Sequence, residues 1–265
     1  MSLSITPGTN NVGAYINNVD LTNLNNNQAT EIKKTLDKFG VIFIKNQNLD
    51  PESYQNFAKQ IGQPVIYPRL KGLDEKFPYI NVIERKPDDK SLSFGSSWLH
   101  QDTSYVQTDR PRWTALMGIE IPQGQGNTIF SSGFNAYEKL PNEIKEKIKS
   151  ATGIFSSAGP IAVTRLEREK EKGKKAKELI SKHKLIRKIN SKYTLYCSPG
   201  HFIRFNNSKI DKKLKTYLFK HQLKKSFQYS LEWEKNQLAI WDNRSMLHQA
   251  TAFKGDRIMY RITVQ

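Results

Sequence analysis

The sequence is poor in cysteine, in long apolar runs and in acidic residues. Cys197 is the only cysteine among 265 residues, which excludes internal disulfides and cysteine-rich metal sites and fits a reducing compartment. No apolar run is long enough to cross a bilayer, and the first residues lack the basic and apolar regions of a signal peptide. We therefore expect a cytoplasmic protein with no membrane partner.

Acidic residues are outnumbered by basic ones, 25 against 42, and the net charge is +17. Such a field attracts nucleic acid, anionic membrane surfaces or small anions without selecting among them. The lysines are scattered along most of the chain and are not gathered on one recognisable binding element. We expect no nucleic-acid partner and favour a small-molecule substrate.

The hydrophobic pattern predicts one domain over residues 1–265, mainly β with helices. Helices are expected at 25–40 and from Pro51 through Ile61, and many short strands follow, including 112–122, 126–133, 237–243 and 257–264. Many short strands with turns between them indicate a barrel or jelly roll. The charge-rich segment within 155–190 is expected to be an inserted helical arm or lid.

The stretch WLHQDTSY, residues 98–105, contains the first candidate site. In an extended segment, residues i and i+2 point to the same side, so His100 and Asp102 can present a ring nitrogen and a carboxylate oxygen to one point. An ordinary His–Asp hydrogen bond in a loop is the alternative. A metal site needs a third ligand from elsewhere in the chain.

His248 is the best third ligand among the four later histidines. It follows the predicted strand 237–243 through a turn, which places it at a strand end on the rim of a barrel. His183 and His221 are better explained as solvated or partly packed side chains. Two histidines and one carboxylate form the set used for non-haem iron(II) that activates oxygen.

Two arginines, Arg257 and Arg261, lie four residues apart in a predicted strand and therefore face the same side. Arginines in that position can receive carboxylates through paired hydrogen bonds. The alternative is that they lie at the surface and pair with Asp256 or Glu120.

With these residues in view, the sequence resembles the taurine dioxygenase (TauD/TfdA) family of iron(II)- and 2-oxoglutarate-dependent oxygenases. The resemblance runs through nearly the whole chain, from FGVIFIKNQNL through WLHQDTSY and GQGNTIFSSG to LAIWDNRSMLHQATAFKGDRIMYRITV, whose WDNR…H…RIMYR part is the most specific. It implies a double-stranded β-helix, or jelly roll. It also implies iron(II), 2-oxoglutarate and O2 as cofactor and co-substrates, with succinate and CO2 as co-products.

Carried over by position, the resemblance makes His100, Asp102 and His248 the iron ligands. Arg257, with help from Thr128, holds the distal carboxylate of 2-oxoglutarate, and Arg261 faces the substrate. The resemblance also places three further residues toward the substrate: Tyr67, Ser96 and His201. Members of the family often form dimers or tetramers, so a homo-oligomer is a possible state, although no interface is readable in the sequence.

The chain departs from the family pattern near the substrate. Leu99 separates Trp98 from His100, whereas the family's usual pattern has tryptophan directly before that histidine. Taurine users carry a histidine where this chain has Tyr67 and a phenylalanine near the position of His201, which argues against taurine itself. We expect hydroxylation of a small anionic or zwitterionic compound, such as a sulfonate or phosphonate.

Two other functions remain open at this point. A demethylase of the same superfamily that acts on a macromolecule would account for the basic charge. A jelly-roll binding protein without catalysis would account for the fold, but it has no physical need for three metal ligands and a carboxylate clamp.

Overall fold

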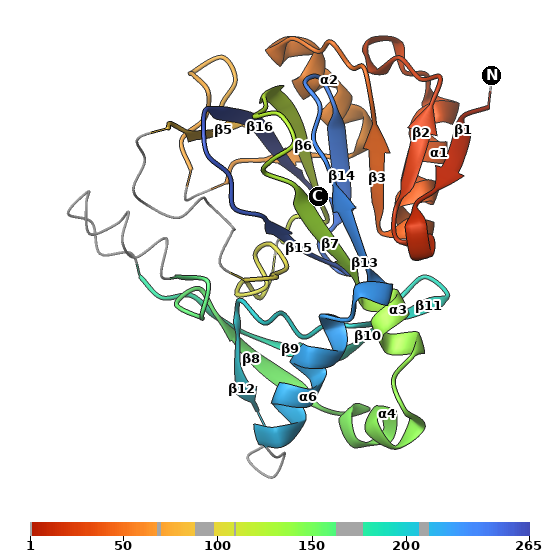
Figure 1. Cartoon of the computed structure of the whole chain (residues 1–265), viewed down its shortest axis with the longest axis vertical. Helices are drawn as coiled ribbons and strands as arrows, with labels where there is room; N and C mark the ends of the chain where they lie inside the picture. Colours follow the sequence, from red (N-terminus) through yellow and green to blue (C-terminus); the bar gives the residue numbers. More distant parts are fainter. Residues whose placement is uncertain (1, 68–69, 88–97, 109, 163–176, 207–211) are drawn as a thin grey trace.

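A computed structural model describes residues 2–67, 70–87, 98–108, 110–162, 177–206 and 212–265 (Figure 1). Its largest sheet has eight strands, of which seven follow one another in hydrogen-bonded order and β5 (Asn81–Arg85) pairs with β16. In their order across the sheet, the seven strands are β1 (Ser4–Pro7), β2 (Ala14–Asn17), β3 (Val41–Ile44), β14 (Leu238–Asp242), β6 (Trp113–Glu120), β16 (Arg257–Val264) and β4 (Pro64–Val65).

A smaller antiparallel sheet faces the large one. It contains β13 (Gln228–Leu231), β7 (Thr128–Ser132) and β15 (Met246–Ala250). Between the two sheets lies a buried cluster in which Phe43, Trp241 and Met259 of the large sheet meet Phe130 and Leu231 of the small one. Two sheets packed over such a core form the jelly roll that the sequence predicted.

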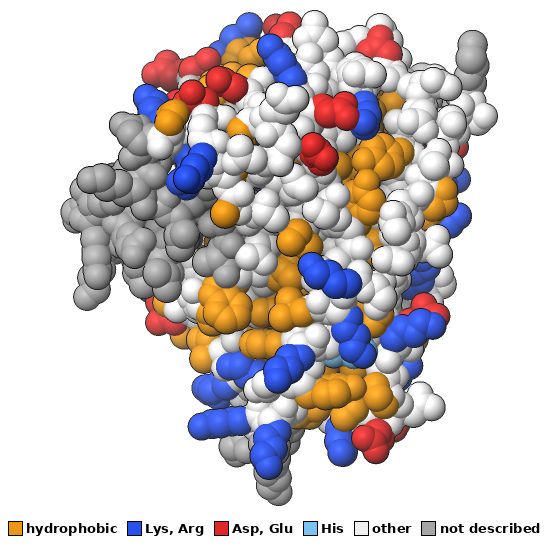
Figure 2. All heavy atoms as spheres, viewed as in Figure 1, with side chains coloured by type: hydrophobic (Ala, Val, Ile, Leu, Met, Phe, Trp, Pro, Cys, Tyr) orange, Lys and Arg blue, Asp and Glu red, His pale blue; other side chains and the backbone are white. Residues whose placement is uncertain are grey.

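A third sheet and a hairpin form the lower part of the molecule in Figure 1. The sheet contains β12 (Phe202–Phe205), β8 (Thr152–Ser156) and β9 (Ile180–Lys184), and the hairpin pairs β10 (Ile186–Ile189) with β11 (Lys192–Leu195). This part has its own core, in which Phe155 and Phe202 pack edge to face at 5.3 Å between ring centroids. Most Lys and Arg side chains on the face shown in Figure 2 cover this lower part.

The helices cover the two cores. The α-helices are α1 (Asn26–Phe39), α2 (Pro51–Ile61), α3 (Gly133–Glu138), α4 (Asn142–Ile148) and α6 (Lys212–Gln222), and the 3-10 turns are η1 (Thr9–Asn11), η2 (Leu21–Asn23) and η3 (Lys225–Phe227). Helices α1 and α2 bury Leu36 and Phe57 against the large sheet. Helix α6 buries Leu218 in the lower core.

The local sequence explains where the N-terminal elements begin and end. Asn25 and Gln28 form a reciprocal capping box at the start of α1, and Gly40 ends that helix at φ 79°, which glycine adopts at low cost. Asp50 caps α2, whose first residue is Pro51. The strand VIFI between them is buried along its whole length.

The structure differs from the sequence expectation in two places. The described parts of 155–190 include strands β9 and β10, where a helical insertion was expected, and residues 163–176 lie outside the described part of the chain. That this segment acts as a lid stays a prediction. Strand β15 was not expected, so His248 lies within a strand of the small sheet and not at a turn beyond a strand.

Candidate active site

His100 and His248 face each other across a short antiparallel bridge. The His100 amide donates to the His248 carbonyl at 3.0 Å, and the His248 amide donates to the His100 carbonyl at 2.8 Å. The two rings lie 4.2 Å apart, centroid to centroid. Backbone hydrogen bonds therefore fix the separation of two side chains that are 148 residues apart in sequence.

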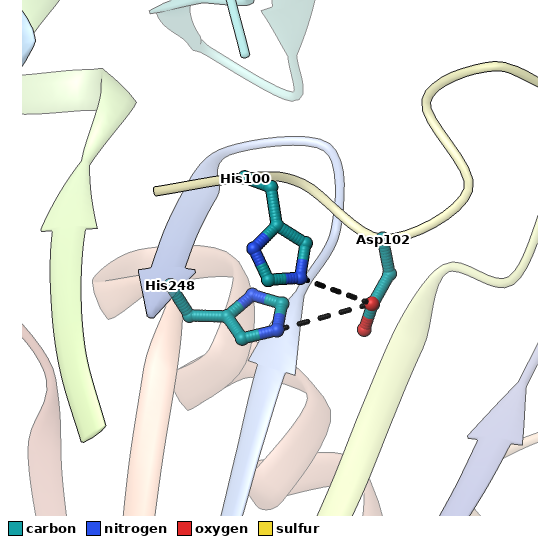
Figure 3. Close-up of side chains that lie close together, drawn as sticks. All are labelled: His100, Asp102 and His248. Atoms are coloured by element: carbon teal, nitrogen blue, oxygen red, sulfur yellow. Dashed lines mark ion pairs between the residues drawn. The ribbon is translucent and has the colours of Figure 1, made fainter. Parts of the chain in front are cut away.

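Asp102 joins the pair from a turn, with Thr103 following at a positive φ of 52°. Its Oδ1 lies 3.9 Å from His100 Nε2 and 3.8 Å from His248 Nε2, and both ring nitrogens point at the carboxylate (Figure 3). These distances are too long for hydrogen bonds, so the His–Asp hydrogen bond considered above is not formed. One ligand atom from each residue lies within 4.8 Å of the others.

The second oxygen of Asp102 is held by the protein. Thr114 donates its hydroxyl to Oδ2 at 2.8 Å, and Arg261 Nη2 lies 3.1 Å from the same atom. Burial raises the pKa of this carboxyl, but the charge of Arg261 and the hydrogen bond from Thr114 outweigh burial and hold the pKa well below its usual range. Asp102 is therefore ionised, with Oδ1 free for a cation.

Both histidines are neutral. Burial lowers the pKa of His248 to about 3, with a further contribution from His100, and burial also lowers the pKa of His100. His100 Nδ1 lies 2.9 Å from the Trp98 carbonyl, which fixes the ring proton on Nδ1 and leaves a lone pair on Nε2. Two neutral imidazoles and one carboxylate suit iron(II) and leave other coordination positions open.

A pocket next to these three residues contains Thr128 on β7 and Arg257 and Arg261 on β16. Arg257 is 6% exposed, and no carboxylate among the described residues lies within 4 Å of it. Its guanidinium packs 5.0 Å from the centre of the Phe253 ring, and burial lowers its pKa to about 10. Surface pairing of Arg257 with Asp256 or Glu120 is thus not observed.

Aromatic residues lie on the other side of Arg261. Its guanidinium is 4.4 Å from the centre of the Tyr67 ring, and the Tyr67 hydroxyl lies 3.1 Å from that of Tyr105. The His201 ring packs edge to face against Tyr105 at 4.9 Å and against His100 at 5.9 Å. The structure thus places His201 against His100 and Tyr67 against Arg261, while Ser96 lies outside the described residues.

The family model described as "Taurine catabolism dioxygenase TauD, TfdA family" matches residues 4–263. The chain belongs to this family. It is an alpha-ketoglutarate (2-oxoglutarate)-dependent dioxygenase, an oxidoreductase that uses iron(II), 2-oxoglutarate and O2.

Curated relatives of this TauD/TfdA dioxygenase share about a quarter of its residues. The alpha-ketoglutarate-dependent sulfate ester dioxygenase of Pseudomonas putida is 25% identical over an alignment 277 residues long, gaps included. The alignment covers 100% of this chain and 90% of that protein. The alpha-ketoglutarate-dependent sulfonate dioxygenase of Saccharomyces cerevisiae is 25% identical over 260 residues, which cover 91% of this chain but 61% of the yeast protein.

The fold is also that of solved structures. A taurine dioxygenase from Burkholderia xenovorans superposes with a TM-score of 0.82 at 24% identity, covering 100% of this chain and 89% of that one. This likeness shows the jelly-roll fold of the dioxygenase. Among the described residues, no helix has the length and apolar character needed to cross a membrane.

Two contributors to the site were missed in the sequence. Thr114 positions Asp102, and it also accepts a hydrogen bond from Asn243 at 2.9 Å. Tyr105 lies within the stretch 98–105, three residues after Asp102. Its spacing in the sequence does not indicate whether Trp98 or Tyr105 faces the His100, Asp102 and His248 cluster. His183 and His221 are 6% and 2% exposed, and each lies within hydrogen-bonding distance of a backbone carbonyl, so they are packed and not solvated.

Proposed function

We propose that this dioxygenase hydroxylates a small organic anion, with sulfonates and sulfate esters as the first candidates and succinate and CO2 as co-products. The observation that carries the proposal is the pair of buried arginines on β16, which share one pocket with the three metal ligands. The names of the Pseudomonas and yeast relatives support sulfonates and sulfate esters as the substrate class.

His100, Asp102 and His248 are assigned as the iron ligands in this proposal. Iron bound to two imidazoles and a carboxylate keeps open positions for 2-oxoglutarate and oxygen and supplies the oxidising chemistry. The contribution of the chain is placement. Thr114 and Arg261 hold Asp102 Oδ2, so that Oδ1 faces the metal without a competing hydrogen bond.

Arg257 is assigned to the distal carboxylate of 2-oxoglutarate. A buried guanidinium without a counter-charge is costly, and an incoming carboxylate offsets that cost with paired hydrogen bonds. Thr128 supports the same carboxylate. Its Oγ1 already accepts a hydrogen bond from Trp233 Nε1 at 2.9 Å, which leaves the hydroxyl proton of Thr128 free to donate.

Arg261 is assigned to the substrate anion, together with Tyr67, Tyr105 and His201. The contact of Arg261 with Asp102 places the guanidinium directly beside the metal ligands, so an anion bound to Arg261 holds its neighbouring carbon near the reacting position. The aromatic rings of Tyr67 and His201 flank this position and exclude water from it.

The test measures succinate formed from 2-oxoglutarate in air with added iron(II). A panel of alkyl sulfonates, sulfate esters, phosphonates and carboxylates is compared with neutral alcohols of the same carbon skeleton. We expect the sulfonates or sulfate esters to stimulate turnover most, and Arg261→Gln to lose this stimulation while 2-oxoglutarate still binds. Stimulation by the neutral compounds alone contradicts the proposal.

A further inference from the structure

A second pocket, of about 270 Å3, shares only Asp102 with the lining of the pocket assigned above. Four arginines line it: Arg110, Arg112, Arg187 and Arg244. Its other walls include Tyr196 and Asn243. None of the roles assigned to the metal, 2-oxoglutarate or substrate uses these arginines.

Two of the four arginines are neutralised inside the fold. Arg244 Nη2 lies 2.5 Å from Asp242 Oδ2 and 3.3 Å from Asp37 Oδ1, and Arg112 pairs with Asp37 as well. These two guanidinium groups therefore have carboxylate partners. We assign them a structural role, in which they link the β14–β15 turn to α1 through ion pairs.

Among the described residues, no carboxylate pairs with Arg110 or Arg187. Asp109 is not one of the described residues. Both arginines are partly buried, and the Nη1 atom of Arg187 is fully buried without a hydrogen bond. They flank one aromatic ring, with guanidinium carbons 5.9 Å and 4.7 Å from the centre of Tyr196. The Tyr196 hydroxyl accepts a hydrogen bond from Arg110 at 3.3 Å.

Electrostatics favours an anion between these two groups. Burial lowers the pKa of Arg187, and the charges of Arg110 and Arg244 add to this effect; Tyr196 and Asp242 act in the opposite direction, but the pKa stays below its usual value. His183, within 3.4 Å of Arg110, adds no charge of its own, since burial lowers its pKa to about 4 and the ring is neutral. Asp102 also lines the pocket, but its carboxylate is paired with Arg261.

We infer that Arg110 and Arg187 form a binding site for a small oxyanion, of the sulfate, phosphate or carboxylate class. Guanidinium groups bind such ions through paired, charge-assisted hydrogen bonds. The Nη1 atom of Arg187, which makes no hydrogen bond within the described part of the chain, is a donor for such an ion. The site is connected to the metal ligands through hydrogen bonds. Asn243 on its wall donates to Thr114, which donates to Asp102.

The test uses the whole chain free of metal and 2-oxoglutarate, so it does not depend on the proposed function. Isothermal titration at constant ionic strength measures binding of sulfate, phosphate and succinate against chloride. Melting temperatures are unsuitable because sulfate stabilises most proteins by exclusion from their surface. We expect saturable binding of one oxyanion. The order among the three anions separates an inorganic oxyanion from a carboxylate.

Three variants locate the bound anion. Arg187→Gln and Arg110→Gln are each expected to weaken binding at least about tenfold, because each removes charge-assisted hydrogen bonds. Arg257→Gln removes the proposed 2-oxoglutarate position, and the binding that depends on Arg110 and Arg187 is expected to keep its wild-type affinity in this variant. Circular dichroism confirms that each variant folds. The inference is overturned by wild-type protein without saturable binding, or by binding that is lost in Arg257→Gln but kept in the other two.

Discussion

The two walls of the active site differ in how their backbone is made. One wall consists of regular strands, with Thr128 on β7, His248 on β15 and two arginines on β16. The other consists of the turn at 98–108 and the segment 198–201, which carry His100, Asp102, Tyr105 and His201. The strand wall presents the residues assigned to 2-oxoglutarate, whereas the loop wall presents Tyr105 and His201, two of the four residues assigned to the substrate.

Hydrogen bonds and close contacts hold the loop wall in place. The Gly200 amide donates to the Leu99 carbonyl at 3.1 Å, and Ser181 donates to the Ser104 carbonyl at 2.6 Å. A Cβ at Gly200 would lie 2.8 Å from His100 Cβ, so only glycine allows these two segments to approach so closely. On the proposed assignments, strands carry the groups that bind the co-substrate and the substrate anion, and loops add Tyr105 and His201 beside them.

The largest effect is expected where the two walls meet, at the metal ligands. His248→Ala removes a strand ligand, and we expect loss of stoichiometric iron binding and of succinate formation. The fold is expected to remain, because the backbone bridge to His100 does not involve the ring. Iron content and circular dichroism are measured together. His221→Gln, a buried histidine on α6, is the control, and equal iron loss there argues against the assigned ligands.

The next largest effect tests the strand wall. Arg257→Gln removes the guanidinium assigned to the distal carboxylate, and we expect the KM for 2-oxoglutarate to rise roughly 100-fold, the equivalent of two charge-assisted hydrogen bonds. The KM for the primary substrate should change little. Arg204→Gln, at an exposed position of strand β12, serves as the control. A rise in the KM for the primary substrate alone contradicts the assignment of Arg257 to 2-oxoglutarate.

Thr114 on β6 connects the two walls, because its hydroxyl donates a hydrogen bond to the Asp102 carboxylate in the loop wall. A substitution at Thr114 tests this connection. Thr114→Val keeps the side-chain shape but removes the hydrogen bond to Asp102, and we expect iron affinity to fall about 10- to 100-fold. Competition with a chelator measures the affinity. Unchanged affinity means that Arg261 alone positions the carboxylate.

The sequence predicted the strand wall better than the loop wall. Apolar runs and caps located β3, β14, α1 and α2, and the four-residue spacing of Arg257 and Arg261 correctly placed both side chains on one face of a strand. Such periodic patterns are local and survive in a single sequence. Strand β15 was missed because its residues, MLHQA, mix polar and apolar side chains without a run or a strict alternation.

The cluster of His100, Asp102 and His248 was predicted, but for a partly wrong reason. His100 and Asp102 were expected to converge because an extended segment points i and i+2 to one side, whereas Asp102 lies in a turn. Convergence depends on the bridge to His248 and on Thr114, which are contacts between distant segments. The spacing of two residues cannot reveal such contacts, and this is also why Tyr105 and Thr114 were not predicted.

A smaller effect concerns stability away from both walls. The folded-state pKa of His183 is about 4 because of burial and the charges of Arg110 and Arg187, whereas an unfolded histidine titrates near 6.5. The unfolded chain therefore binds more protons between these values, and the free energy of unfolding falls as pH decreases from 6.5 to 4. The slope from His183 is at most about 1.4 kcal/mol per pH unit, and solvent screening reduces it.

Urea unfolding between pH 4.5 and 7.5 measures this slope for wild type and His183→Gln. The other buried histidines contribute equally to both proteins, so the difference isolates His183. We expect a shallower dependence in His183→Gln. Identical slopes show that His183 is protonated to the same extent in the folded and unfolded chains.

The smallest effect is expected for a single hydroxyl on the loop wall. Tyr105→Phe removes the partner of the Tyr67 hydroxyl, and a neutral hydrogen bond contributes about 0.5 to 1.5 kcal/mol, equivalent to a change of about 2- to 12-fold. We expect this change in the KM for the primary substrate, with the KM for 2-oxoglutarate unaffected. Tyr193→Phe, on the exposed hairpin strand β11, is the control. If Tyr105→Phe raises the KM for 2-oxoglutarate instead, the loop wall also binds the co-substrate, and the division of labour between strands and loops fails.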